Sequence, residues 1–375
     1  MMKKIILFFV ISAAVSLSSC TGNGSVAGRV GGDTVSFKYA RHITVVKYKG
    51  YSVVSLVDPW KQGKVLHAYV LVPREAPLPP SLPEGTVVRT PLTRSVVFTT
   101  AHCQLLEYLG KAWQIKGVAD LKYILIPDIQ RRVRQKKIAD CGESMSPVIE
   151  RIIDLKPDGI ILSPFENSGG YGRLENIGVP LIEAADYMET SALGRAEWMR
   201  FYGMLYGCET RADSLFRVVD STYTALKRAA DKLPVGRSIL TERKTGSVWY
   251  CPAGGSTIGQ MIRDANGRYA FSHDRRSGSL ALSFELVLDK AGDCDVWAFK
   301  FNGEKPMSKA DLLAEFRGYN ELRAFKTGNI YQCNASKRPY FEEVPFRPDY
   351  LLRDMILLLH PDRKQFGSLR YYERY

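Results

Sequence analysis

The stretch VIERIIDLKPDGIIL, residues 148–162, contains the local pattern on which the fold assignment rests. Val148 to Leu155 has the apolar spacing of a short helix, and Pro157 ends it, because proline lacks an amide proton and cannot continue a helix. Gly159 to Leu162 is a continuous apolar run, which is typical of a short strand buried on both faces. A helix followed closely by such a strand predicts one unit of a parallel sheet covered by helices.

The same alternation of strands and helices extends in both directions from this stretch. Upstream, strands are predicted at Val96–Phe98 and Ile115–Val118, with a helix at Cys103–Leu109 between them. Downstream, a strand is predicted at Val179–Glu183, and the alternation resumes after Ser238. The later predictions are strands at 238–240, 248–250, 296–301 and 330–333 and helices at 257–264, 284–290, 309–316 and 349–359. The order predicts an α/β fold of two lobes, with mainly parallel sheets flanked by helices.

Two segments depart from this alternation. Residues 35–72 are rich in short alternating apolar runs and predict a β-rich N-terminal segment. Between Ala192 and Leu233 the strands stop, and apolar residues recur at steps of four and three, which predicts a long bridging α-helix. Its predicted buried face consists of Leu215, Val219, Thr222, Leu226, Ala229 and Leu233. The predicted divisions are 1–19, 20–34, 35–188 (N-terminal lobe), 189–235 (connecting helix region) and 236–375 (C-terminal lobe).

The N-terminus has the parts of a bacterial lipoprotein signal. Lys3 and Lys4 precede an apolar run, Ile5 to Val15, that is too short to span a bilayer as a stable helix. The run leads to Leu-Ser-Ser-Cys, ending at Cys20, which resembles a lipobox. We expect cleavage before Cys20 and lipidation of its thiol; the alternative is an ordinary secretory signal with a chance cysteine. The polar, glycine-rich residues 21–33 predict a flexible tether.

The net charge and the spacing of cysteines and histidines limit which partners and which kinds of reaction are expected. The formal net charge is +13, so the surface favours anionic partners such as phospholipid headgroups or a negatively charged ligand, while the extracytoplasmic compartment excludes nucleic acid. The six cysteines after Cys20 form no CxxC pair, and cysteines within apolar runs are more often buried than bridged. The five histidines show no metal-ligand spacing, so no metal site is predicted. His102 and Cys103 are adjacent, which does not suit a base and its nucleophile, and we expect no enzyme activity and no catalytic cofactor.

Four segments in this order resemble the periplasmic binding proteins that capture iron-siderophores, haem or cobalamin for ABC importers. They are Arg94–His102 with Ile115–Val118, Ile149–Leu162, Ser283–Leu288 with Asp295–Trp297, and Arg347–Asp349 with His360–Pro361 and Tyr371–Tyr372. The resemblance implies a lipoprotein whose ligand lies between two lobes joined by a stiff helix, so that closure is small.

The resemblance also implies a permease dimer as partner, with one glutamate of each lobe bound by arginines of the permease. Glu150 and Glu285 match those positions. Without the resemblance, each is equally a solvated glutamate favoured at a helix start. We expect a monomer that faces the periplasm from a bacterial membrane, with surface exposure left open. The alternatives are a carrier lipoprotein that works without a permease and, more distantly, an enzyme on a related scaffold.

The expected ligand is an iron-siderophore, haem or corrinoid, because aromatic side chains with a few cations suit a large, flat, partly anionic molecule. Any one of these aromatics could instead be a core residue. The residues predicted to contact it follow the expected strand ends: Thr100, His102, Phe165, Tyr171, Arg173, Trp249, Tyr250, Trp297, Arg338 and Tyr340.

Overall fold

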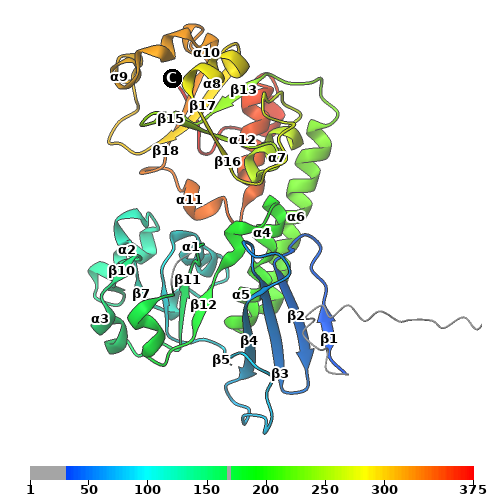
Figure 1. Ribbon diagram of the computed structural model, residues 1–375, viewed down its shortest axis with the longest axis vertical. Helices are drawn as coiled ribbons and strands as arrows, with labels where there is room; N and C mark the ends of the chain where they lie inside the picture. The colour runs from blue at the N-terminus through cyan, green and yellow to red at the C-terminus, as the bar shows by residue number, and fades with distance from the viewer. Residues whose placement is uncertain (1–30, 167–169) are drawn as a thin grey trace, which may run out of the picture.

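The computed structural model describes residues 31–166 and 170–375. The predicted signal peptide and Cys20 lie outside these residues. Among the helices that are described, none is both long enough and apolar enough to cross a membrane. The fold class predicted from the sequence is confirmed: two α/β lobes are linked by a long helix, and a β-rich segment precedes them (Figure 1).

The β-rich segment forms its own sheet of five strands in sequential order. All neighbours are antiparallel except the last pair, β4 and β5, which are parallel. The sheet extends beyond the predicted 35–72 at both ends. Its strands are β1 (Asp33–Val35), β2 (Ile43–Tyr48), β3 (Tyr51–Val57), β4 (Val65–Pro73) and β5 (Thr86–Thr90).

The N-terminal lobe contains a wholly parallel sheet in the order β12-β11-β6-β7-β8. Its central strands are buried on both faces, as their continuous apolar sequences predicted. The strands are β6 (Ser95–Val97), β7 (Ile115–Val118), β8 (Ala139–Asp140), β11 (Gly159–Leu162) and β12 (Leu181–Glu183). Three helices and a small hairpin belong to it: α1 (Thr100–Tyr108), α2 (Pro127–Arg134), α3 (Ile149–Asp154), and β9 (Gly142–Glu143) with β10 (Ser146–Pro147).

The C-terminal lobe has a sheet in the order β13-β17-β18-β19, parallel except for the final strand, and a separate antiparallel sheet, β14-β15-β16, that the sequence did not predict. The strands are β13 (Ile239–Thr241), β14 (Lys244–Thr245), β15 (Val248–Pro252), β16 (Ser279–Leu282), β17 (Val296–Phe301), β18 (Ile330–Asn334) and β19 (Glu373–Arg374). The helices are α7 (Thr257–Asp264), α8 (Phe284–Ala291), α9 (Lys309–Glu315), α10 (Arg323–Lys326), α11 (Tyr340–Glu343) and α12 (Pro348–Leu359).

The long helix is α6 (Glu209–Ala230), which packs on α5 (Met199–Leu205) and on α12 and so contacts both halves of the chain. Its buried face overlaps the predicted one: Val219 is fully buried, and Leu215 and Leu226 pack partly buried against the same core. Phe216 and Tyr223, which were not predicted, are buried as well, because burying large aromatic rings removes much apolar surface from water. The Tyr223 hydroxyl donates to Asp264 of α7 at 2.9 Å, which fixes the helix against the C-terminal lobe.

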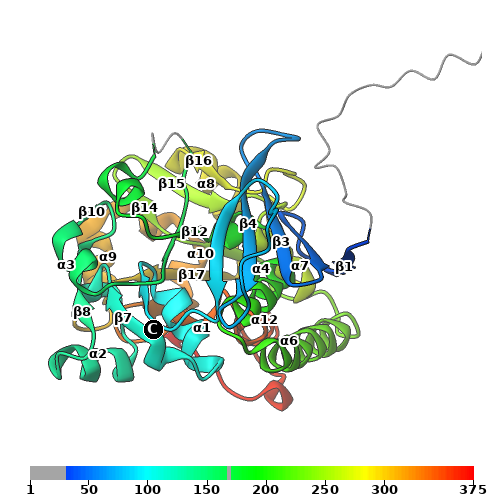
Figure 2. The same cartoon turned by 90° about the horizontal axis from the view of Figure 1, so that it is seen from below.

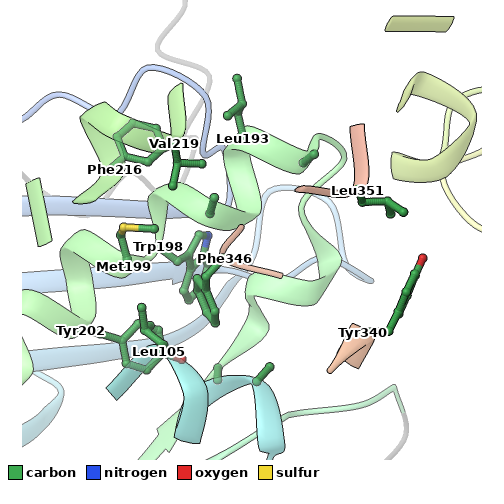
Figure 3. Close-up of a cluster of buried hydrophobic side chains, with 14 of the residues drawn as sticks. Leu105, Leu193, Trp198, Met199, Tyr202, Phe216, Val219, Tyr340, Phe346 and Leu351 are labelled. Carbon is green, nitrogen blue, oxygen red and sulfur yellow. The ribbon is translucent and has the colours of Figure 1, made fainter. Parts of the chain in front are cut away.

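The largest of the described hydrophobic clusters is built from residues that are distant in the sequence. Leu105 of α1, Trp198 and Tyr202, Phe216 and Phe346 pack into one cluster (Figure 3). All six described cysteines are free. Cys208 is partly exposed and the other five are buried, as expected for small apolar residues in a core.

Two buried carboxylates hold the N-terminal sheet to the helices. Glu197, at the end of α4 (Ala192–Glu197), accepts the backbone amides of Lys38, Tyr39 and Ala40 at 2.7–2.9 Å. Glu189 accepts the next two amides along the chain and the Trp198 indole N–H. The consecutive amides between β1 and β2 have no strand partner, and these carboxylates satisfy them.

We predict that Glu197→Ala lowers the free energy of unfolding by about 3 kcal/mol, because it leaves buried amides without an acceptor. The matched control is Glu209→Ala, which removes an exposed ion pair with Lys47 at the same junction and should change stability by less than about 0.5 kcal/mol. Urea unfolding at neutral pH measures both. Equal stabilities of the two variants would show that the carboxylate does not hold the sheet.

Candidate functional site

A cavity of about 490 Å³ opens at the carboxyl ends of the central strands of the N-terminal lobe, and we call it the N-lobe cavity. Residues directly after β6 and β11 form its floor, and the β9–β10 hairpin and the segment after residue 169 form its walls. Its lining is mostly apolar, with hydroxyls of serine, threonine and tyrosine. The residues are Phe98, Thr99, Ser144, Met145, Pro147, Leu162, Ser163, Phe165, Gly170, Tyr171, Gly172 and Leu174.

A second cavity of about 410 Å³, the C-lobe cavity, opens at the ends of β13 and β17. Open α/β sheets bind ligands at this edge, since the loops after the carboxyl ends of neighbouring strands converge there. Its lining is polar and carries charge. The residues are Glu242, Arg243, Thr245, Tyr250, Pro252, Ser256, Thr257, Ile258, Ser277, Gly278, Ser279 and Lys300.

The short helix α11 contacts a residue beside the N-lobe cavity and a residue that lines the C-lobe cavity. Thr100, which follows the N-lobe cavity residue Thr99, donates to Glu342 at 3.1 Å. On its other side, the ammonium of Lys300 in the C-lobe cavity lies over the Tyr340 ring, 5.2 Å from its centre. Figure 1 shows α11 between the two lobes. Residues of α11 therefore contact both lobes close to the two cavities.

The charged groups of the C-lobe cavity are held in place by ion pairs. Lys300 pairs with Glu242 and Arg243 pairs with Glu315. Burial opposes the charge on Lys300, but Tyr340 and Glu242 beside it raise the pKa of this side chain above its ordinary value, so it is an ammonium at neutral pH. Within the described residues, the buried Nε of Arg243 has no hydrogen-bond acceptor. The cavity lining thus contains a guanidinium and an ammonium, each paired with a carboxylate.

His102 does not face the N-lobe cavity, in contrast to the sequence prediction. It is 2% exposed, and its Nε2 lies 2.8 Å from Asp186 Oδ1. Burial would raise the pKa of Asp186, but His102 and Arg195 hold it below its usual range. Asp186 is therefore a carboxylate that accepts the Nε2 proton of His102, and Nδ1 of the same ring lies within hydrogen-bond distance of the Thr99 hydroxyl. His102 contacts Thr99, and Thr99 lines the cavity.

The sequence did not identify Asp186 as the partner of His102, because the two residues are distant in the chain. His102 does not activate Cys103. That thiol is fully buried, and burial raises its pKa well above the usual range, which keeps it protonated.

Three of the predicted aromatic contacts lie where the prediction put them. Phe165 and Tyr171 line the N-lobe cavity, and Tyr250 lines the C-lobe cavity. Trp249 and Trp297 do not line either cavity. Both are fully buried in the core of the C-terminal lobe, with ring centres 5.9 Å apart, and their indole N–H groups donate to backbone carbonyls. We withdraw these two as ligand contacts.

The other predicted contacts also lie outside the two linings. Thr100 is bonded to Glu342, and Tyr340 is buried beneath Lys300. Arg338 is half exposed near Glu373. Arg173 points away from the N-lobe cavity and pairs with Glu150 at 2.8 Å.

Glu150 and Glu285 are exposed in the first turns of α3 and α8, one on each lobe (Figure 1). The amide at its own position and then Arg173 lower the pKa of Glu150; the corresponding amide and the Ser283 hydroxyl lower that of Glu285. Both are therefore carboxylates at neutral pH. This placement suits a docking surface and also a plain helix start.

Sequence reasoning missed several cavity residues. Ser163 and Arg243 follow predicted strands, so their positions after strand ends were available as a signal. Ser144 and Met145 lie in a hairpin of two-residue strands, which leaves no readable pattern. Across residues 31–166 and 170–375, no group of three or more His, Cys, Asp or Glu side chains is arranged to hold a metal ion.

Comparison with known proteins gives consistent matches. The family model described as periplasmic binding protein matches residues 96–336. An uncharacterized lipoprotein of Methanocaldococcus jannaschii is 24% identical over 370 residues, covering 91% of this chain and 86% of the relative. A periplasmic binding protein from Veillonella parvula has a TM-score of 0.61 at 14% identity, covering 83% of this chain and 98% of the other. S. aureus IsdE, solved in complex with heme, has a TM-score of 0.55 at 16% identity, covering 72% and 99%.

Proposed function

The chain belongs to the periplasmic binding protein family, and we propose that it is a lipid-anchored solute-binding protein that holds its cargo between the N-lobe and C-lobe cavities. The observation that carries this proposal is the pair of cavities at the carboxyl edges of two sheets, with α11 in contact with both lobes close to them. The family and the fold are those of solute-binding proteins rather than enzymes.

The two linings point to a cargo with an apolar part and an anionic part. Phe98, Phe165 and Tyr171 offer aromatic surface in the N-lobe cavity, and Arg243 and Lys300 offer cations in the C-lobe cavity. A tetrapyrrole or corrinoid, or an iron-siderophore with an aryl group, combines both features. A structural neighbour, IsdE, was solved with heme, which supports this class of cargo.

We further propose that an ABC permease dimer receives the cargo through Glu150 and Glu285. Both carboxylates are exposed, and each lies on a different lobe. Glu150 already pairs with Arg173, and an arginine of the permease would replace that partner. The exchange costs little, because exposed ion pairs contribute little to stability. Cys20, as the lipidated residue, would keep a monomer at the outer face of the membrane.

A carrier that works without a permease remains the second candidate. It shares the fold and the cavities, and the first-turn position of both glutamates needs no partner. The two candidates differ in the effect of replacing these glutamates, which the second prediction below tests.

The first prediction concerns the cavities. Titration with haemin, cyanocobalamin or a ferric hydroxamate should quench the intrinsic tryptophan fluorescence for at least one of them. For that compound, Phe165→Ala with Tyr171→Ala should weaken binding at least tenfold, because two aromatic contacts are lost. Tyr123→Ala removes an exposed aromatic side chain outside both cavities and should leave affinity unchanged. Full affinity in the double variant would contradict the assignment of the N-lobe cavity.

The second prediction concerns the permease. Glu150→Ala with Glu285→Ala should abolish uptake of the cargo in cells while ligand affinity stays at the wild-type value, because both side chains lie outside the cavities. Lysine at both positions should be at least as damaging. Glu84→Ala with Glu304→Ala removes two other exposed glutamates and serves as the control. Wild-type uptake in the Glu150/Glu285 variant would favour the carrier without a permease.

A further inference from the structure

The parallel sheet of the N-terminal lobe has a second edge, formed by the amino ends of its strands. Basic residues lie shortly before three of the strands: Arg94 before β6, Lys136 and Lys137 before β8, and Lys156 before β11. Lys116 lies at the start of β7. Because parallel strands begin at the same edge of a sheet, the topology gathers these side chains.

The contacts confirm that they are neighbours. Arg94 donates to the carbonyls of Leu155 and Lys156, at 3.1 and 3.3 Å. Arg132 of α2 donates to the carbonyls of Ala112, Trp113 and Ile115, which fixes the end of α2 beside β7. The Lys116 ammonium donates to the Trp113 carbonyl at 2.9 Å. Figure 2 shows α2, β7 and β8 together at one end of the molecule.

The cations of this edge are crowded and poorly neutralised. Burial, and then Arg132 and Arg94, lower the pKa of Lys116. Arg134, Lys136 and Lys137 are exposed and form no ion pair with a described residue. Among nearby acids, Asp128 pairs with Arg131 and Arg132, and Asp158 is taken by Arg74. Glu107, which is half-buried, lies near Arg131 and Arg132 as well as Asp128, and Asp154 is exposed at the end of α3. Gathering like charges costs stability, which an anionic partner would restore.

A large aromatic side chain is exposed among these lysines and arginines. Trp113 is 58% exposed, and the Lys116 ammonium lies 5.8 Å from its ring centre. An exposed tryptophan among lysines and arginines is the composition that binds a bilayer surface, where the ring enters the headgroup region and the cations meet anionic lipid. We propose that this basic edge is a contact surface for an anionic membrane.

The proposed lipid anchor would keep the chain close to a membrane. Under the proposed function, Cys20 lies in the membrane, and residues 21–32 extend at most about 40 Å. The basic edge is the amino edge of the same sheet whose carboxyl edge forms the N-lobe cavity. Contact through the basic edge therefore leaves that cavity directed away from the lipid and open to cargo, and delivery to a permease in the membrane would require release from this contact.

Vesicle binding by the chain without residues 1–20 tests this surface. Every described strand and helix begins after residue 32, so this chain keeps the whole described fold. It should bind vesicles of phosphatidylcholine with phosphatidylglycerol far better than phosphatidylcholine alone, and added salt should weaken that binding. Arg134→Gln, Lys136→Gln and Lys137→Gln together should reduce it about 100-fold, since each cation at such a surface contributes roughly a factor of five. Trp113→Ala should also weaken it.

The matched control replaces Arg217, Arg228 and Lys232 with glutamine, which removes the same charge from the surface of α6 and the turn after it. It should bind vesicles like the wild type. Equal loss in the control would mean that net charge, and not this edge, drives binding. Equal binding to both vesicle types would overturn the proposal, as would a preference for polyglutamate over vesicles, which would assign the edge to an acidic protein.

The anchor is tested separately, with the full chain. Radiolabelled palmitate should enter the wild type and not Cys20→Ala. Palmitate labelling of Cys20→Ala would contradict the anchor and would not affect the vesicle result. Failure to bind vesicles would contradict the membrane contact surface and would not affect the anchor. The two failures are therefore distinguishable.

Discussion

The direction of the strands is the constraint on which the rest of this structure depends. In the N-terminal lobe β6, β7, β8, β11 and β12 all run the same way, and in the C-terminal lobe β13, β17 and β18 do so. A parallel sheet has two chemically different edges, because every strand begins at one and ends at the other. The loops after the strands form both cavities, and in the N-terminal lobe the residues before the strands carry the cations.

The buried carboxylates make this arrangement rigid. Glu189 and Glu197 tie the β1–β5 sheet to the helices next to α6, and Asp186 fixes the His102 ring that contacts Thr99. Each of these carboxylates accepts several hydrogen bonds, which compensates for its removal from water. The long helix α6 packs on elements of both halves, so relative motion of the lobes bends a stiff element, which favours small closures over large ones.

The sequence predicted what local patterns determine. β7, β11, β17 and α7 have the predicted bounds, because their apolar runs and flanking breakers are local signals. It did not separate Trp249 and Trp297 from Tyr250, since burial on both faces depends on neighbouring strands. It did not give the partner of His102, which is remote in sequence, or the β14-β15-β16 sheet, whose pairing is set by tertiary contacts. On α6 the sequence pattern placed Val219 on the buried face but did not include Phe216 and Tyr223, whose burial depends on tertiary contacts.

The central claim is that one cargo molecule lies between the two cavities. The most direct measurement is native mass spectrometry, with an absorption spectrum, of the protein purified from its own cells. The account predicts one stoichiometric ligand that denaturation releases, with a Soret, corrin or ferric-siderophore band. A protein recovered from ligand-replete cells without bound mass or absorption, which also fails to bind the three test compounds, would contradict it.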